Sequence, residues 1–493
     1  MEENIKSKIS PKVDENMAYM KELFRNASDI VYREFYIGSI QAALVYIDGM
    51  GDKILLDDYV LQSVMLSHEN IKYIKELKDI KDRLLTVTDV KETDKLDDAI
   101  KSMLTGDTIM FLEGNEGCYV IASRAWPTRS VGEPSTETTV KGARDSFTET
   151  IRVNTALVRR RIRDSRLKIM PKSLGRRSKT DTVIMYIDDI VNKNILDETI
   201  KRIDKIDIDA VIDSGYVQQL IEDKKWSPFP QIQSTERPDV VAAALYEGRV
   251  AILVDNSPFA IIVPATLPNL FQSPDDYYQR WLNASTIRVI RFFAIVLSLV
   301  LPALYVAVTS YHTSIIPSKL AYSIAASREG VPFPAYIEAI IMELSLTFLI
   351  EAVIRLPRPI GATIGIVGGL IIGQAAVSAG IVSPIMIIIV SITSITSFIT
   401  PNYEVASAFR IFRFLLIIAS AIVGLFGIMI GLIFIIIHLV KIDSFGVPYL
   451  SPMVNPEVKD FKDMFIRAPL QFFKERPSYM STPDKVRQKK SDK

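Results

Sequence analysis

The sequence predicts a two-part α/β cytoplasmic N-terminal region followed by an α-helical polytopic membrane bundle. Charged residues are dense and apolar runs are short up to residue 281, whereas long apolar runs dominate from residue 289 to residue 440. A strand–turn–helix pattern also occurs twice in the N-terminal part. The averages over 493 residues, 48% hydrophobic with a net charge of +1, hide this division.

The repeat predicts two related α/β subdomains. Residues 42–65 form a β-branched apolar run, an acidic turn and an amphipathic stretch, and residues 182–203 repeat that order with a shared Tyr-Ile-Asp. Residues 106–123 and 248–264 each read as strand, tight turn and strand. The alternative is a coincidence between two ordinary strand–turn–helix units.

A basic segment lies between the two subdomains. Residues 148–169 are expected to form an amphipathic helix with apolar residues on one face. Because no aromatic residues are interleaved and the chain is not basic overall, we expect contact with a membrane surface or a neighbouring subunit and no nucleic acid. The candidate contact residues are Arg159, Arg160, Arg161 and Arg163.

Four segments are long and apolar enough to cross the roughly 30 Å of a bilayer core. They cover residues 289–310, 360–378, 384–400 and 414–440, and the last, counted as one uninterrupted span, is the least ambiguous. The predicted parts are a polar N-terminal extension (1–28), α/β subdomain 1 (29–139), a basic amphipathic helical linker (140–180), α/β subdomain 2 (181–285), a membrane domain of about four spans plus one re-entrant or amphipathic helix (286–440) and a basic cytoplasmic tail (441–493).

Small and polar residues mark two of the predicted spans. Glycines at strict four-residue spacing form one helix ridge, with an amide beside it that is costly in lipid. Hydroxyl residues on the next span either bond back to their own helix or line a water-filled path for monovalent cations. The candidate pore or helix-packing residues are Gly361, Gly365, Gly369, Gly373, Gln374, Ser391 and Ser394.

The acidic segment 335–356 is the least typical of a span. Glu338, Glu343 and Glu351 make it a poor lipid-facing helix, so it is expected to be re-entrant, interfacial or inside the bundle. The three carboxylates are a candidate acidic route for cations, and plain interfacial anchoring is the alternative. Whether this segment crosses decides the predicted side of the tail, and we expect both termini inside.

The sequence offers little for catalysis. Three histidines and the single Cys118 cannot supply the clustered ligands of common zinc sites. Residues 175–180 lack the glycine spacing of a phosphate-binding loop, and the pair Asp275–Asp276 is more typical of a turn or a helix start. We therefore expect no enzyme activity, no cofactor and no metal. The lone cysteine and the polar residues 1–16 fit a reducing compartment and no cleaved signal.

Many short sequences resemble one known family, the A subunits of GerA-type spore germinant receptors. The matching runs extend in order from about residue 28 to residue 440. They are residues 144–161 (RDSFTETIRVNTALVRRR), 175–180, 213–216 (DSGY), 227–231 (SPFPQ), 235–240 (TERPDV), 248–255 (GRVAILVD), 276–278, 324–334 (IAASREGVPFP), 355–361 (RLPRPIG) and 373–376 (GQAA). At 141–146 (KGARDS) the chain departs from the family's usual Gly-Pro-Arg-Glu-Gly type sequence, which puts the shape of that loop in doubt.

The resemblance implies a subunit of a nutrient germinant receptor in the inner membrane of a bacterial endospore. Similar proteins work with a transporter-like B subunit and a lipoprotein C subunit, and form a homo-oligomer that serves as a cation-release channel. The alternative is a non-conducting scaffold that relays a signal from the germinant-binding subunit.

Overall fold

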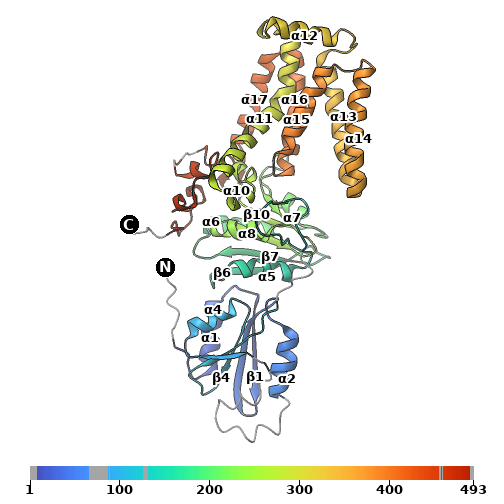
Figure 1. The fold of residues 1–493 in the computed structure, drawn as a ribbon. Coiled ribbons are helices and arrows are strands. Elements are labelled where there is room, and N and C mark those ends of the chain that lie inside the picture. The colour runs from blue at the N-terminus through green and yellow to red at the C-terminus, as the bar shows by residue number, and fades with distance from the viewer. Residues whose placement is uncertain are drawn as a thin grey trace. The chain divides into compact units, whose positions relative to one another are not determined.

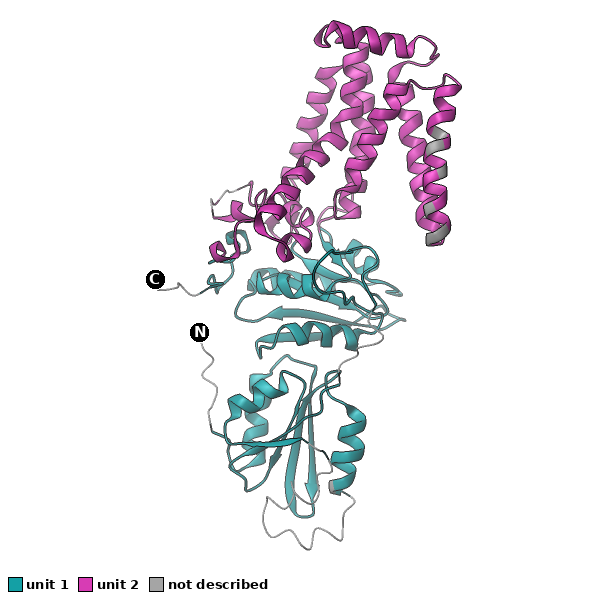
Figure 2. Cartoon of the chain, viewed as in Figure 1, with its two compact units in different colours: residues 1–222, 232–264, 474–493 teal, residues 223–231, 265–473 magenta. Residues whose placement is uncertain are grey.

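The computed structural model describes residues 8–65, 87, 89–125, 132–454, 457 and 459–488, apart from the side chains of a few residues in its helices. The chain forms two compact units, coloured separately in Figure 2. The α/β unit comprises residues 1–222, 232–264 and 474–493, and the helical unit comprises residues 223–231 and 265–473. Many elements of both units are labelled in Figure 1.

The first half of the α/β unit is built on a five-stranded sheet with the order β1-β2-β4-β5-β3. All neighbouring strands are antiparallel. Its elements are α1 (Val13–Leu23), β1 (Ile30–Ile37), β2 (Ile40–Ile47), a π-helical turn (Leu55–Leu61) that continues into α2 (Gln62–Met65), β3 (Val90–Thr93), α4 (Leu96–Met103), β4 (Thr108–Leu112) and β5 (Cys118–Ile121). Apolar residues of α1 and α4 pack on one face of the sheet.

The second half has a five-stranded sheet with the order β6-β7-β9-β10-β8, again antiparallel throughout. Its elements are α5 (Ile151–Arg161), β6 (Leu167–Leu174), β7 (Thr180–Ile187), α6 (Lys193–Asp204), α7 (Ser214–Ile221), β8 (Gln233–Thr235), α8 (Pro238–Tyr246), β9 (Val250–Val254) and β10 (Ala260–Val263). Helices α5 and α8 contribute to the core on one face of this sheet.

The two sheets have corresponding strand orders, as a repeat of one unit would produce. Leu44 of β2 pairs with Met110 of β4, and Ile184 of β7 pairs with Ile252 of β9 in the same place of the second sheet. The outer strands β1, β3, β6 and β8 were not predicted. Strand β6 lies inside the range assigned to a linker, and it pairs with β7 along its whole length. The predicted extension contains α1, and Val13, Met17 and Met20 of this helix are buried in the first core.

The helical unit contains one long apolar helix after another. They are α11 (Trp281–Ser310), α13 (Ala335–Arg355), α14 (Arg358–Ser378), α15 (Pro384–Phe398), α16 (Tyr403–Val423) and α17 (Leu425–Val440). Shorter elements are α9 (Leu267–Leu270), α10 (Asp275–Tyr278), α12 (Ser318–Arg328), the hairpin of β11 (Asp443–Ser444) with β12 (Val447–Pro448) and several 3₁₀ turns, including Thr313–Ile315, Asp460–Asp463 and Leu470–Phe472.

The prediction of one uninterrupted span over residues 414–440 is wrong. Helix α16 ends at Val423, and α17 begins at Leu425 after Gly424, whose φ of 64° lies in the left-handed region. Glycine adopts this conformation at little cost, so it allows the chain to change direction inside a long apolar run. A Cβ on Gly427 would lie 2.2 Å from the carbonyl oxygen of Ala419, so α17 packs closely on α16.

Contacts between helices show the directions in which α11, α16 and α17 run. The Tyr311 hydroxyl, just after α11, donates to the Ala421 carbonyl near the end of α16. Phe412, in the middle of α16, contacts the His438 ring near the end of α17, with 6.0 Å between ring centroids. Helices α11 and α16 therefore run in the same direction, and α17 returns.

Candidate functional site: buried charges in the helical unit

A buried ion pair joins α13 to α16 inside the helical unit. Arg413 Nη1 donates to Glu343 Oε2 at 2.9 Å, and both side chains are almost wholly buried. The pair leaves Glu343 Oε1 and both Nε and Nη2 of Arg413 without a hydrogen-bond partner. Buried polar groups normally have partners, so these three atoms keep capacity for further hydrogen bonds.

A small pocket adjoins this pair. It has about 250 Å³ of empty space, counting the part that opens outward, and its lining includes Glu343, Ser394, Arg410 and Arg413. The structure therefore brings together two predicted residues from different spans, the carboxylate of Glu343 and the hydroxyl residue Ser394 of α15. The arginines were not predicted, and they give the pocket an excess of positive charge.

Glu338 lies at the other end of α13 from Glu351 and is completely buried. Arg328 Nε, at the end of α12, donates to Glu338 Oε1 at 3.2 Å, and the backbone N–H of Ser383 donates to Oε2 at 2.9 Å. The carboxylate thus holds the beginning of α15 beside the beginning of α13. This arrangement has a clear structural role.

Glu351 differs from the other two acids. Its side chain is about half exposed, and Arg355 Nε of the same helix donates to it at 2.8 Å. The predicted acidic set therefore separates into two buried carboxylates that each bond another element and one exposed i,i+4 pair. Only Glu343 has both a pocket and an unpartnered oxygen.

The four ridge glycines of α14 have different surroundings. A Cβ on Gly361 would lie 3.0 Å from the carbonyl oxygen of Val353, so α14 approaches the α13 backbone closely there. A Cβ on Gly365 would lie 3.7 Å from the Val353 side chain, and one on Gly373 would lie 3.8 Å from Ile387 of α15. Gly369 has no atom within 4 Å of its Cβ position.

Three of the predicted polar and small positions lie on the surface of the helical unit. Gly369 and Gln374 of α14 and Ser391 of α15 are exposed, whereas Ser394 is half-buried. The exposed amide of Gln374 lies in an apolar helix, and packing within one chain does not explain it.

The basic belt requires a correction. Arg159 is fully buried, so it is not a surface contact. Its Nε and Nη2 donate to the two carboxylate oxygens of Asp29, each at 2.8 Å, and its Nη1 donates to the carbonyls of Asp164 and Leu167. This arginine joins the two halves of the α/β unit. Arg161 is half-buried against Asp145, while Arg160 and Arg163 are exposed.

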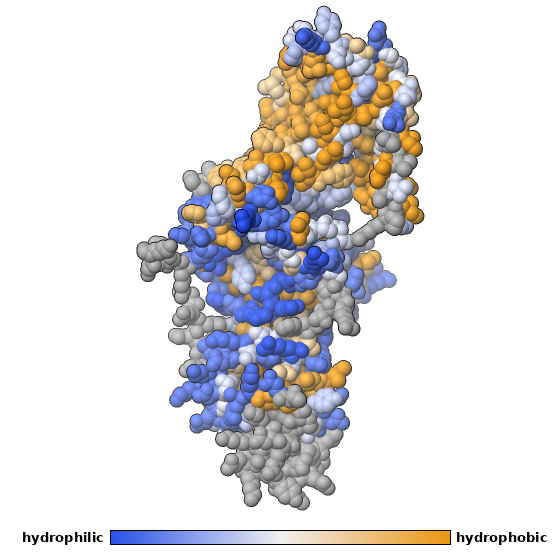
Figure 3. All heavy atoms as spheres, in the orientation of Figure 1, coloured by the Kyte–Doolittle hydropathy of each residue, from blue (hydrophilic) through white to orange (hydrophobic). Residues whose placement is uncertain are grey.

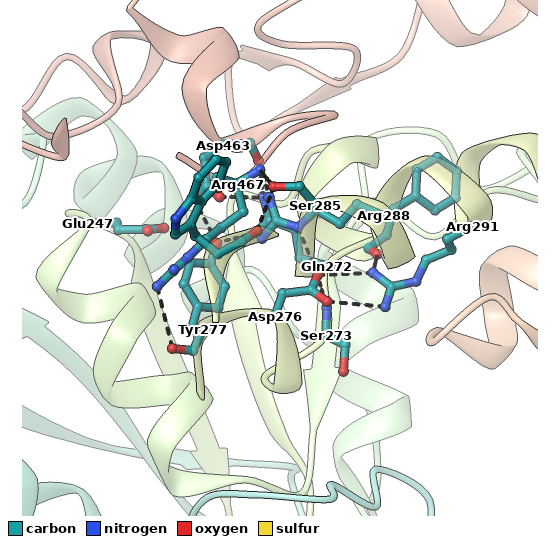
Figure 4. Close-up of polar contacts among 12 residues, drawn as sticks. Glu247, Gln272, Ser273, Asp276, Tyr277, Ser285, Arg288, Arg291, Asp463 and Arg467 are labelled. Atoms are coloured by element: carbon teal, nitrogen blue, oxygen red, sulfur yellow. Dashed lines mark hydrogen bonds and ion pairs between the residues drawn. The ribbon is translucent and has the colours of Figure 1, made fainter. Parts of the chain in front are cut away.

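A second charge network, shown in Figure 4, was missed by the sequence analysis. Asp276 of α10 accepts hydrogen bonds from Arg288 Nε at 2.8 Å and Arg291 Nη1 at 3.0 Å, both from α11. Arg288 Nη1 also donates to Asp463 Oδ1 at 2.7 Å. Two arginines one turn apart at the start of an apolar stretch were a usable signal, but Asp463 is too distant in the chain to be inferred.

The chemistry of the remaining candidates is limited. Cys118 is buried in β5, and burial, helped by the charge of Glu92, raises the pKa of its thiol to about 12. Such a thiol is inert at neutral pH. In the described part of the chain, no three His, Cys, Asp or Glu side chains gather in a way that could hold a metal ion.

A duplicated α/β unit combined with long apolar helices that enclose charge pairs defines a protein with a folded polar domain and a candidate membrane domain. The family model described as Bacillus/Clostridium GerA spore germination protein matches residues 18–479. The chain belongs to this GerA family.

Several relatives match almost the whole chain. Spore germination protein GerLA of Bacillus cereus is 41% identical, with 95% of this chain and 96% of that protein covered. Spore germination protein KA of Bacillus subtilis (strain 168) is 40% identical, with 98% and 90% covered. A protein of the same strain described as the uncharacterized membrane protein YfkQ is 42% identical, with 98% and 94% covered.

One solved structure also matches. It is the crystal structure of the N-terminal domain of the A subunit of the Bacillus megaterium spore germinant receptor GerK3, which is 38% identical. The match covers 53% of this chain and 98% of that chain, with a TM-score of 0.43.

Proposed function

We propose that this chain is the A subunit of a nutrient germinant receptor, located in the inner membrane of the bacterial endospore. Its copies form an oligomer that releases monovalent cations and so triggers germination. Membership of the GerA family and relatives named spore germination proteins support the germination role. The channel role rests on the helical unit.

The surface of the helical unit supports a membrane location. By length and composition, two helices among the described residues could cross a bilayer, Trp281–Ser310 and Tyr403–Val423, and two shorter apolar helices accompany them. Figure 3 shows hydrophobic surface concentrated on the helical unit. Large apolar side chains such as Ile422, Phe426 and Phe434 are more than half exposed. Such a surface requires lipid or other helices to cover it.

The C-terminal segment supports an even number of crossings. Arg476 Nε donates to the Tyr246 carbonyl at 2.8 Å, and Asn192 Nδ2 donates to the Met480 carbonyl, so residues 474–488 fold onto the α/β unit. The chain leaves that unit after Pro264 and returns at Lys474. We therefore place both ends on the cytoplasmic, spore-core side, with six crossings by α11, α13, α14, α15, α16 and α17.

Crossing by α13 is compatible with its acids. Glu338 and Glu343 are buried and bonded within the unit, so neither faces lipid. Glu351 lies near the end of the helix, where a paired carboxylate reaches polar surroundings. We therefore propose the bundle-interior placement among the three that composition left open.

The single observation that carries the channel proposal is the exposed face of α14. Gln374 is exposed there, and Gly369 has open space where a side chain would be. In lipid an unpartnered amide is unfavourable, whereas a neighbouring subunit or a water-filled path satisfies it. We propose that copies of the chain meet at this face of α14. The transporter-like B subunit and the lipoprotein C subunit complete the receptor.

One observation favours the alternative of a non-conducting signal-relay scaffold. Both buried acids are already paired with arginines, Glu338 with Arg328 and Glu343 with Arg413. Neither therefore offers an uncompensated negative charge to a cation. In a scaffold, the same pairs would only hold α12, α13 and α16 together.

The test compares Gly369→Leu and Gln374→Leu with Ile433→Phe, a change on the exposed apolar surface of α17. A polar contact between membrane helices is worth about 0.6–2 kcal/mol, so loss of the Gln374 amide should slow potassium release roughly threefold to thirtyfold. Release is measured from germinating spores and from liposomes that contain the purified oligomer. Assembly is checked by the mass of the oligomer.

Ile433→Phe should leave both readouts unchanged. Normal potassium release by assembled Gly369→Leu and Gln374→Leu receptors would remove the channel assignment. Absence of flux from wild-type oligomers in liposomes would favour the scaffold.

A further inference from the structure

The arginine cluster, which we define as Arg288, Arg291, Arg467, Asp276 and Asp463, adjoins an apolar pocket. The pocket has about 490 Å³ of empty space, counting the part open to solvent. Arg288 and Arg291 line it together with apolar residues that include Phe271, Ile295, Met453 and Phe465. Its surface therefore combines two guanidinium groups with hydrocarbon.

The cluster has one more positive charge than negative charge. Asp276 and Asp463 accept from Arg288 and Arg291, and the guanidinium of Arg467 lies over the Tyr277 ring, 5.9 Å from its centroid. Each arginine keeps one nitrogen without a hydrogen-bond partner, namely Arg288 Nη2, Arg291 Nε and Arg467 Nε. A buried guanidinium N–H without an acceptor is unfavourable, so an anionic oxygen that accepts from these arginines would stabilise the cluster.

The pocket lies where an apolar helix begins. Arg288 and Arg291 occupy the first turns of α11, and the long apolar stretch of this helix follows them. Positively charged residues at the end of a span lie at the depth of lipid headgroups. An occupant with an anionic head and a hydrocarbon chain fits this combination of groups.

A tryptophan at the same end of the helical unit supports a position of the pocket at the depth of the lipid headgroups. Trp226 is 99% exposed and follows Lys224 and Lys225. In the same loop, Phe229 packs against Phe409 of α16, with 5.2 Å between ring centroids. The pocket residue Phe271 also stacks on Phe409, with 6.2 Å between ring centroids. Tryptophan and lysine together are typical of the membrane–water interface.

We infer that this pocket binds one anionic phospholipid from the surrounding bilayer, with its phosphate at Arg288 and Arg291 and part of an acyl chain among Phe271, Ile295 and Met453. The bound lipid ties α11 to the C-terminal segment that carries Asp463 and Arg467. This inference rests on the membrane location proposed above, and it goes beyond the channel role because it assigns a ligand to a different site.

The experiment uses the full chain, reconstituted with equimolar phosphatidylglycerol and phosphatidylcholine and then extracted with mild detergent. Native mass spectrometry counts the lipids that remain bound. We expect phosphatidylglycerol to be retained in preference to phosphatidylcholine. Since one basic side chain near an anionic lipid contributes about a fivefold change in binding, Arg291→Gln should lower that preference by about fivefold.

A second pair of variants avoids the charge network, in case Arg291→Gln fails to fold. Met453 is 41% exposed and lines the pocket, so Met453→Trp should fill it and reduce lipid retention. Met429 is 59% exposed on α17 outside this pocket, and Met429→Trp should leave retention unchanged.

Three results would overturn the inference. They are equal retention of both lipids, unchanged retention in Met453→Trp, and full displacement of phosphatidylglycerol by inorganic phosphate, which would assign the site to a free anion. A chain that does not float with liposomes would instead contradict the proposed membrane location, so the two failures are distinguishable.

Discussion

The two units each bury an arginine–carboxylate pair, and the two pairs differ in how completely they are bonded. In the α/β unit, Arg159 bonds both oxygens of Asp29 and two backbone carbonyls. In the helical unit, Arg413 makes one bond to Glu343, and three polar atoms of the pair have no partner. The side chains are almost equally buried.

This difference separates two uses of buried charge. A fully bonded pair recovers most of the cost of removing charge from water, and it fixes one arrangement of the elements that it joins. A partly bonded pair keeps part of that cost, and it gains from any water, ion or side chain that approaches. The Arg159 pair therefore suits a joint between subdomains, and the Arg413 pair keeps capacity for a further polar partner.

The largest expected effect is the loss of Arg159. Arg159→Ala leaves Asp29 buried without its counter-charge, so it should lower the free energy of unfolding of the α/β unit by about 3–5 kcal/mol. Amide hydrogen exchange in β1 and β6 of the full chain measures this. The matched control is Arg163→Ala, an exposed arginine of the same segment, which should change little. Equal protection in both variants would contradict the role of Arg159 as a joint.

The next effect concerns the incompletely bonded pair. Arg413→Leu alone leaves Glu343 buried without its counter-charge, so it should destabilise the helical unit. The double variant Glu343→Leu/Arg413→Leu should have a free energy of unfolding within about 2 kcal/mol of wild type, because apolar residues often replace a buried ion pair at little cost. Thermal unfolding in detergent gives the stability, and potassium efflux from liposomes gives the function.

We expect the double variant to be folded but altered in efflux. A double variant as unstable as Arg413→Leu would make this pair architectural, like Arg159–Asp29. A stable double variant with normal efflux would remove it from the functional site.

The smallest expected effect is a pH dependence of the α/β unit. Burial raises the pKa of the Glu137 carboxyl from 4.5 to about 7. A hydrogen bond from Thr235 and the charge of Arg237 lower this pKa, and the charge of Glu236 raises it. The folded chain thus holds a proton that the unfolded chain releases near 4.5. The contribution of Glu137 to stability is complete below pH 4.5 and is lost as the pH rises through about 7, by at most roughly 3 kcal/mol.

Urea unfolding of the full chain at several pH values between 4.5 and 8 measures that loss. Glu137→Gln should flatten this part of the profile, and the exposed control Glu133→Gln should not. A wild-type profile that is already flat would show that Glu137 titrates at the same pH in both states.

Much of the fold was predictable because its signals are local. Apolar runs with nearby turn residues predicted six strands. Strands β4, β5, β9 and β10 lie within the predicted segments, and β2 and β7 each begin two residues before theirs. The edge strands were missed. In β1 and β6 the residues are mixed, with exposed positions such as Arg33 and Ser173 contributing no clear pattern, and β3 and β8 are only four and three residues long. The break at Gly424 was missed because one glycine barely changes the hydropathy of a long apolar run, so the run reads as a continuous span.

The candidate site was less predictable. Composition indicated that Glu338, Glu343 and Glu351 matter, yet it could not separate the pocket acid from the two others, since the separation depends on Arg328 and Arg413 from other helices. The basic belt misled for a similar reason. Arg159 has the same charge as its exposed neighbours, and only the position of Asp29 decides that it is buried.

By itself, the sequence determined the division into a polar region and an apolar region, the internal repeat and the family, because hydropathy, turn residues and family motifs are properties of neighbouring residues. The tertiary structure decided which charges are paired, which face of α14 is exposed and where the long apolar run folds back. Those features depend on contacts between residues far apart in the chain. An ion pair such as Arg288–Asp463 exists only after α11 and the C-terminal segment have packed together.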